Sequence, residues 1–264
     1  MFDILKEELE LLGYSKETID VYIHYNQDFL RFIKKEPKCV SSQDIKRYLL
    51  HNINKKPRTI NLMISALKFY YDRIYHKKLF HSIRRMKQEK HIPLVISKEN
   101  IRKMIESTSN IKHRILIELL YGSGLRAGEC TRLRINDLNL DEGYGIIRQG
   151  KGKKDRYIIL SERFVNDMRN YLSKRKDDNQ FIFNTSKGHY STRTAEVIIG
   201  NAARKIGLNV FPHALRSSFA THLIENGIDI SKIQMLLGHS RIDTTRNYIK
   251  TSVRDLKEIK SPLD

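Results

Sequence analysis

Apolar residues recur every three or four positions through the first third of the chain, and this is the spacing of one face of an α-helix. Three stripes of this kind are Phe2, Leu5, Leu9 and Leu12, then Val21, Tyr22, Tyr25, Phe29, Phe32 and Ile33, then Ile60, Ile64, Leu67 and Tyr71. Each stripe can bury one face against the others. The pattern therefore predicts a small helical unit in this part of the chain.

Residues that commonly begin helices stand at the starts of these stripes. Ser15 is placed to cap the second predicted helix. Ser41 and Asp44 have the spacing of a capping box for a third helix, and Pro57 suits the first turn of a fourth. We therefore expect a four-helix domain over residues 1–83.

The pattern changes after a basic, polar stretch at residues 84–93 that ends in proline and is typical of an interdomain linker. Beyond it, apolar helical segments surround two alternating stretches, Gly145–Arg148 and Arg156–Leu160, which predict a β-hairpin. Residues 181–183 are expected to form a third short strand, and helices return from Thr192. The fold class predicted is mainly α (α+β), with a linker at 84–96 and a larger domain at 97–264.

The chain is strongly basic. It has 264 residues, with 49 Lys and Arg against 30 Asp and Glu, which gives a formal net charge of +19. Folding does not require such an excess, whereas a polyanion such as nucleic acid would screen it. Residues 29–90 hold 17 basic and four acidic residues, but residues 1–28 are acidic. The first helix is therefore expected to face away from DNA or to pack on another subunit.

Two cysteines, Cys39 and Cys130, are too few for a disulfide framework or a zinc ribbon, and this points to a reducing compartment. No uncharged apolar run approaches the ~20 residues that span a bilayer. The acidic, amphipathic N-terminus is unlike a signal peptide. We expect a soluble, cytoplasmic protein without a membrane partner.

Three segments carry residues suited to phosphate chemistry. GSGLRAGE (122–129) places Arg126 beside a glycine turn, where its guanidinium can reach a cleft and bind a phosphate through two parallel N–H donors. HALRSSFATHL (213–223) places His213 and Arg216 on one side of a helix. Taken singly, these residues are better explained as a surface arginine and as a capping histidine beside an exposed arginine.

The third segment, LLGHSRIDTTRNYI (236–249), contains His239 and Tyr248. A phenol with an ordinary pKa of ~10 is a poor nucleophile at neutral pH. Held among cationic donors, it can attack phosphorus and form a phosphotyrosine ester. On its own, Tyr248 also fits the common role of a half-buried aromatic residue on a helix.

The order and spacing of the candidate residues are more informative than any one segment. The candidate residues occur in this order: Arg126, Lys151 within GKGKKDRYIIL, His213 and Arg216 in HALRSSFATHLIENG, and His239 and Tyr248 in IQMLLGHSRIDTTRNYI. Together they resemble the tyrosine recombinase family. The resemblance is closest to Xer-type site-specific recombinases, and phage-type integrases share it. It covers the C-terminal two thirds of the chain, and the helical N-terminal region is similar in size and position to the core-binding (SAM-like) domain of the family.

The resemblance implies a role for each matched residue. Arg126 and Arg216 hold the non-bridging oxygens of the scissile phosphate, and Lys151 protonates the leaving 5′-hydroxyl. His213 and His239 hydrogen-bond the phosphate or move the proton of the nucleophile. Tyr248 attacks and becomes linked to the 3′-phosphate.

The family also implies a C-shaped clamp around double-stranded DNA and a homo-tetramer on two recombination sites, joined by exchange of C-terminal segments. The implied activity is site-specific cutting and rejoining of DNA, in a role such as Xer-type resolution of chromosome or plasmid dimers. A second recombinase or a DNA translocase is a further partner that the resemblance leaves open.

No cofactor or metal is expected. The sequence has no compact carboxylate cluster for Mg²⁺ and no GxxxxGK[ST] loop, and a covalent ester conserves the bond energy without ATP. One residue differs from the family pattern, and two neighbouring lysines make the assignment of the proton donor less specific. Ser217 stands where Xer-type proteins often have His, and Lys153 and Lys154 lie close to Lys151 as rival proton donors.

Four alternatives remain. A phage or mobile-element integrase shares the chemistry, and a type IB topoisomerase uses similar residues without the GKG hairpin and LLGH segment. A DNA-binding regulator without catalysis would explain the charge alone. A metal nuclease would need His213, His222 and His239 as ligands, but no HExxH motif supports it.

Overall fold

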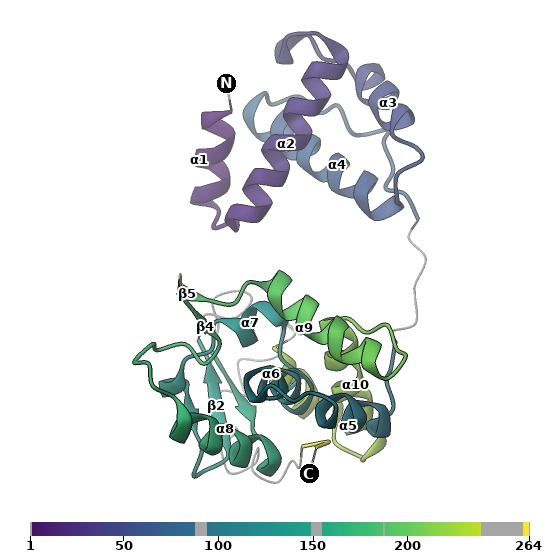
Figure 1. The fold of residues 1–264 in the computed structure, drawn as a ribbon. Coiled ribbons are helices and arrows are strands. Elements are labelled where there is room, and N and C mark those ends of the chain that lie inside the picture. The colour runs from purple at the N-terminus through teal and green to yellow at the C-terminus, as the bar shows by residue number, and fades with distance from the viewer. Residues whose placement is uncertain (1, 88–93, 149–154, 187, 239–260, 264) are drawn as a thin grey trace. The chain divides into compact units, whose positions relative to one another are not determined.

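A computed structural model describes residues 2–87, 94–148, 155–186, 188–238 and 261–263. The chain divides into two units, Met1–His91 and Ile92–Asp264, each with its own hydrophobic core (Figure 1). Across the described residues, no helix is both long enough and apolar enough to cross a membrane.

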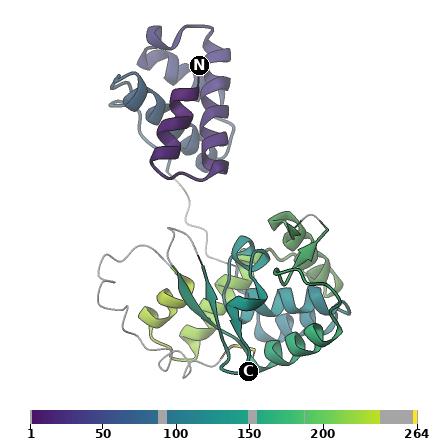
Figure 2. The same cartoon turned by 90° about the vertical axis from the view of Figure 1, so that its left-hand side faces the viewer.

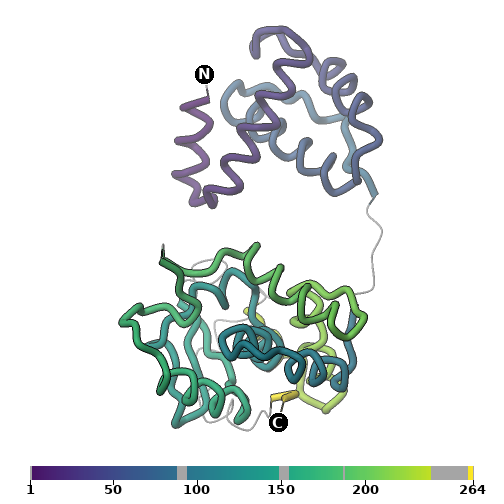
Figure 3. The backbone as a smooth tube through the Cα atoms, viewed as in Figure 1, coloured from purple at the N-terminus to yellow at the C-terminus, as the bar shows by residue number. Residues whose placement is uncertain are grey.

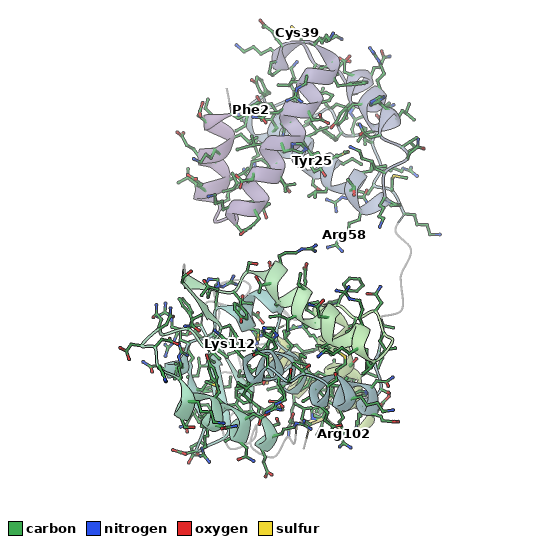
Figure 4. All side chains as sticks on the ribbon, in the orientation of Figure 1. Phe2, Tyr25, Cys39, Arg58, Arg102 and Lys112 are labelled. Atoms are coloured by element: carbon green, nitrogen blue, oxygen red, sulfur yellow. The ribbon has the colours of Figure 1, made fainter. Side chains whose placement is uncertain are left out.

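The N-terminal unit is helical, as its apolar stripes predict. Its α-helices are α1 (Asp3–Leu11), α2 (Lys16–Ile33), α3 (Ser42–His51) and α4 (Pro57–Phe69). A short 3-10 helix, η1 (Pro37–Cys39), precedes α3, and a π-helical segment, η2 (Tyr70–Ile74), follows α4. Figure 3 shows α1 and α2 as neighbouring antiparallel helices. In Figure 4, Phe2 and Tyr25 are labelled on this unit, and both side chains pack partly buried against its core.

The predicted helix starts of this unit are confirmed. The Ser15 hydroxyl accepts a hydrogen bond from the Thr18 amide, and Ser41 with Asp44 forms a capping box. One apolar prediction is wrong, because Leu12 is 50% exposed. It follows the end of α1, where the chain leaves the helical stripe.

One polar contact between α2 and α4 was not expected from the sequence. Asn26 is fully buried, and its side-chain amide donates to the carbonyls of Tyr22 and Ala66. These two bonds satisfy the side-chain nitrogen, while Oδ1 is buried without a hydrogen-bond partner among the described residues. Asn26 therefore fixes how α2 packs on α4.

The C-terminal unit is built around α6 (Ile111–Gly122), in which Ile115 to Gly122 are all buried. The helices packed against it are α5 (Lys98–Glu106), α7 (Ala127–Thr131), α8 (Glu162–Lys174), α9 (Thr192–Lys205) and α10 (Pro212–Glu225). The short α11 (Ile230–Leu237) packs against β3 (Arg156–Ile159) at the side of the sheet (Figure 2). The helix α6 thus forms the centre on which the other elements are placed.

The predicted β-hairpin is confirmed. Strand β2 (Tyr144–Ile147) pairs antiparallel with β3, with Gly145 opposite Ile158. The third strand of the sheet is β1 (Leu138–Asn139), which pairs with β2 after the short turn η3 (Ile135–Asp137). A separate two-stranded ribbon is formed by β4 (Asn184–Thr185) and β5 (Gly188–His189).

The strand expected at residues 181–183 is wrong. Phe181 makes a single bridge to Arg134, and the chain turns at Ile182 and Phe183 before β4 begins. Both turn residues are fully buried in the core. Their apolar character therefore reflects burial rather than a strand.

Candidate active site

A glycine turn sets the position of Arg126. Gly124 lies between α6 and α7 with φ of +60°, and a Cβ atom there would lie 2.4 Å from the Phe219 ring. Only glycine avoids both the strained backbone and this clash. The turn brings Arg126 to the start of α7, with 32% of its side chain exposed.

Glu129 is the centre of the site, and sequence reasoning gave it no role. Its carboxylate accepts from Arg126 Nη1 at 2.7 Å and from the Arg126 backbone amide at 3.0 Å. Arg156 binds the same carboxylate through two donors, Nη1 at 3.0 Å and Nη2 at 2.6 Å. Arg216 Nη1 lies 3.9 Å from Glu129 Oε2. One carboxylate thus lies within ion-pair distance of three arginines, which come from the start of α7, from β3 and from α10.

The charge state of Glu129 follows from this arrangement. Burial alone would raise the pKa of its carboxyl group, but the hydrogen bonds and charges of Arg156 and Arg126 outweigh burial and hold the pKa at about 2. Glu129 is therefore ionised at neutral pH. A signal for it did exist in the sequence, because it lies three residues after Arg126 at the start of a helix.

Arg216 is the most enclosed of the three arginines. It lies on α10 with 4% of its side chain exposed, and it donates to the carbonyl of Gly124 at 2.6 Å and to that of Leu237 at 2.5 Å. Burial, followed by the nearby positive charge of Arg126, lowers the pKa of its guanidinium to about 10. It remains a cation at neutral pH, and its guanidinium has more N–H groups than these two carbonyls accept.

His213 lies one turn before Arg216, in the first turn of α10 after Pro212, and it is exposed. Arg126 and Arg216, which are far apart in the sequence, are brought together around Glu129. Lys151, His239 and Tyr248, together with Lys153 and Lys154, lie outside the described residues.

His222, which a metal nuclease would use as a ligand, lies in the core. It is 4% exposed, and its Nδ1 is 2.8 Å from the Tyr121 hydroxyl. His213 on the same helix is exposed. The two histidines therefore face different environments, and this does not favour a shared metal.

The arrangement around Glu129 is suited to binding an anion. Three guanidinium groups share one carboxylate, so the cluster carries a net charge of two positive units before any ligand binds. Arg126 is partly exposed and can bind a phosphate oxygen, and the buried charge of Arg216 lies beside the same carboxylate. Such preorganised donors stabilise the charge that develops when a phosphoryl group is transferred.

Comparisons with known proteins show which sequences this chain is similar to. The sequence profile of the phage integrase family matches residues 94–254, and that of the phage integrase N-terminal SAM-like domain matches residues 1–80. Tyrosine recombinase XerA of Pyrococcus horikoshii is 35% identical over 97% of this chain and 92% of its own length.

Solved structures share the fold. A crystal structure of XerA recombinase is 30% identical, covers 96% of this chain and 94% of its own, and superposes with a TM-score of 0.54. A lambda integrase dimer bound to a COC′ core site is 21% identical, covers 92% of both chains, and has a TM-score of 0.71.

Proposed function

This chain belongs to the phage integrase family of tyrosine recombinases, and on that premise we propose that it is a site-specific DNA recombinase that cuts and rejoins double-stranded DNA through a covalent 3′-phosphotyrosyl intermediate. The observation that carries the proposal is the pairing of Arg126 and Arg216 around Glu129. The two arginines are 90 positions apart in the sequence, and they converge on one carboxylate where a phosphate can be bound.

In this mechanism Arg126 and Arg216 bind the non-bridging oxygens of the scissile phosphate. The Tyr248 oxygen attacks phosphorus, the bond to the 5′-oxygen breaks, and the phenolic proton passes to a base, for which His213 and His239 are the candidates. Lys151 gives a proton to the leaving 5′-oxygen. Rejoining reverses these steps with the 5′-hydroxyl of another strand, so neither ATP nor a metal ion enters the balance.

The domain organisation proposed is a core-binding domain at 1–83, a linker at 84–96 and a catalytic domain at 97–264. The family matches at 1–80 and 94–254 support it, as does the division of the chain into two units. In this organisation the first domain adds affinity for the duplex while the second carries the chemistry.

We further propose that the biological role is of the Xer type, in which a homo-tetramer on two sites resolves chromosome or plasmid dimers in the cytoplasm. The identity with XerA proteins over nearly the whole chain supports this role. A mobile-element integrase is the second candidate, and a putative integrase/recombinase of Sinorhizobium fredii is 27% identical over 98% of this chain. Sequencing the DNA trapped covalently on the protein in cells distinguishes one fixed chromosomal site from the ends of an element.

Covalent attachment to DNA in the presence of EDTA is the direct test of the chemistry. The protein is incubated with DNA that contains the site identified by sequencing the DNA trapped in cells. This should give a protein–DNA species that survives denaturation. A non-catalytic regulator would bind without forming it, and a metal nuclease would be stopped by the chelator. Absence of the adduct on a site that the protein binds would overturn the proposed function.

DNA binding should weaken steeply with salt. Many of the 49 basic residues are exposed, and Arg58 on α4 and Arg102 on α5 are labelled examples at the edges of their units (Figure 4). Each phosphate that is neutralised releases a condensed counterion, so a plot of log affinity against log salt should have a slope of about −5 or steeper. Filter binding or fluorescence anisotropy between 50 and 300 mM salt, roughly, would measure it. A flat plot would favour recognition through a small patch.

Lys151→Ala should cleave normal DNA slowly and recover when the leaving group no longer needs a proton. A bridging 5′-thiolate has a much lower pKa than a 5′-hydroxyl, so a sulfur-substituted strand removes the need for a general acid. We expect most of the cleavage rate to return on that substrate, as measured by single-turnover adduct formation.

Arg126→Ala is the matched control, and it should stay slow on both substrates because its contribution is to the non-bridging oxygens. If Lys153 or Lys154 supplies the proton instead, Lys151→Ala will show the same modest defect on both strands. Rescue by sulfur will then appear in the variant of that neighbouring lysine.

A further inference from the structure

Arg156 differs from Arg126 because all three of its side-chain nitrogens already donate to protein acceptors. Nη1 and Nη2 bind the two oxygens of Glu129, and Nε donates to the Leu236 carbonyl at 2.8 Å. Its side chain is 9% exposed. It therefore has neither the exposure nor the free edge with which Arg126 can bind a phosphate.

The contacts of Arg156 connect three elements. It begins β3 of the hairpin, it holds Glu129 on α7, and it binds the last turn of α11 through Leu236. Gly238 ends α11 in a left-handed conformation with φ of +61°, and a Cβ atom there would lie 3.0 Å from the Arg156 side chain. The side chain of Arg156 thus fills the space between the hairpin and the end of this helix.

Glu129 and the end of α11 are also the groups that hold the phosphate-binding arginines. Glu129 binds Arg126 and lies beside Arg216, and the Leu237 carbonyl accepts from Arg216. Each acceptor of Arg156 is therefore the same residue as, or the neighbour of, an acceptor of Arg126 or Arg216. A shift of Arg156 would therefore displace both Arg126 and Arg216.

We propose that Arg156 is a positioning residue of the recombination reaction, which fixes the Glu129 carboxylate and the end of α11 so that Arg126 and Arg216 are aligned on the scissile phosphate. It acts without contacting DNA. The inference rests on the proposed function, since it concerns the alignment of the same phosphate.

A pH profile distinguishes positioning from general support of the fold. The groups that face Glu129 are Arg126 on its own helix, Arg156 on β3 and Arg216 on α10, with the buried Cys130 thiol next to it in the chain. Arg156 is the partner that most strongly stabilises the ionised Glu129 carboxylate. Removing Arg156 must therefore raise the pKa of Glu129. Because the ionised form holds the arginines, activity is then lost as pH falls through the raised pKa.

The experiment measures the single-turnover rate of covalent adduct formation from about pH 5 to pH 9 for the wild type, Arg156→Met and Glu129→Gln. At neutral pH, Arg156→Met should be slower by about 100-fold, the usual scale for a misaligned site. As the pH decreases below neutral, the rate of Arg156→Met relative to the wild type should decrease further. Glu129→Gln has no carboxyl group to titrate, so its relative rate should be independent of pH.

The double variant Arg156→Met/Glu129→Gln tests whether Arg156 acts through Glu129. If it does, the double variant is no slower than Glu129→Gln alone, because the effects of coupled residues do not add. This variant also removes both charges together, so it tests the proposal even where an unpaired Glu129 impairs folding. Arg156→Lys keeps the charge but not the two-donor geometry, and it should restore the acid side of the profile more than the neutral rate.

Arg114→Met is the matched structural control. Arg114 also binds a carboxylate through two donors, Nε at 2.7 Å and Nη2 at 3.2 Å to Asp167, but between α6 and α8. It should keep the wild-type rate and profile. Wild-type behaviour of Arg156→Met, or multiplicative losses in the double variant, would overturn the inference while the proposed function stands. A wild type that forms no adduct would overturn both.

Discussion

Tyr248→Phe is expected to abolish covalent attachment to DNA and to leave binding of the site nearly unchanged. The substitution removes one oxygen, and this oxygen is the atom that becomes bonded to phosphorus in the proposed mechanism. The arginines around Glu129 are untouched, so the phosphate is still bound. Denaturing gels would measure the adduct, and anisotropy at fixed salt would measure the affinity.

Tyr157→Phe is a suitable control for this result. Tyr157 lies on β3 with 39% of its surface exposed, and its substitution removes the same single atom from another tyrosine. It should form the adduct at the wild-type rate. An adduct in Tyr248→Phe would mean that another residue is the nucleophile, and peptide mapping of the DNA-linked fragment would identify it.

Local signals predicted most of the helices. The apolar stripes at 21–33 and 60–71, with Ser15, Ser41 and Pro57 at the helix starts, depend only on residues a few positions apart. The β-hairpin was predicted in the same way, from alternation on both sides of a glycine-containing turn. Resemblance to tyrosine recombinases, drawn from four segments, is confirmed by the family matches over most of the chain.

Contacts between distant segments could not be predicted in this way. Glu129 binds Arg156, 27 positions away, and Arg216 binds the carbonyls of Gly124 and Leu237 on either side of it in the sequence. Nothing local distinguishes Arg156 from the other arginines of the chain. For the same reason the buried pair Ile182 and Phe183 was taken for a strand, because burial from all sides and strand pairing select similar residues.

The catalytic roles of all six site residues stay predictions, and Lys151, His239 and Tyr248 also lie outside the described part of the chain. The described part nevertheless narrows what they must do. In the proposed mechanism the two cations Arg126 and Arg216 bind the phosphate, so the remaining tasks are attack, proton removal and protonation of the leaving group. The three predicted residues supply groups suited to those tasks.

Arg216→Ala should combine a large loss of cleavage with a loss of stability, whereas Arg126→Ala should lose cleavage alone. Removal of one preorganised donor of this kind slows a reaction by about 10²–10³-fold. Arg216 is buried, and its removal leaves the carbonyls of Gly124 and Leu237 without a donor, at a cost on the order of 3 kcal/mol. Urea unfolding at constant m-value would measure this cost.

Arg126 provides the contrast because its side chain is a third exposed and its described hydrogen bond is to Glu129. Arg156 still binds that carboxylate when Arg126 is removed, so the free energy of unfolding should fall by about 1 kcal/mol or less. Arg216→Lys keeps a cation but offers no planar pair of donors, and it should recover part of the DNA affinity while cleavage stays slow. Equal stability of Arg216→Ala and Arg126→Ala would mean that the two carbonyl contacts do not hold the end of α11, and the link between the fold and the phosphate site would then have to lie elsewhere.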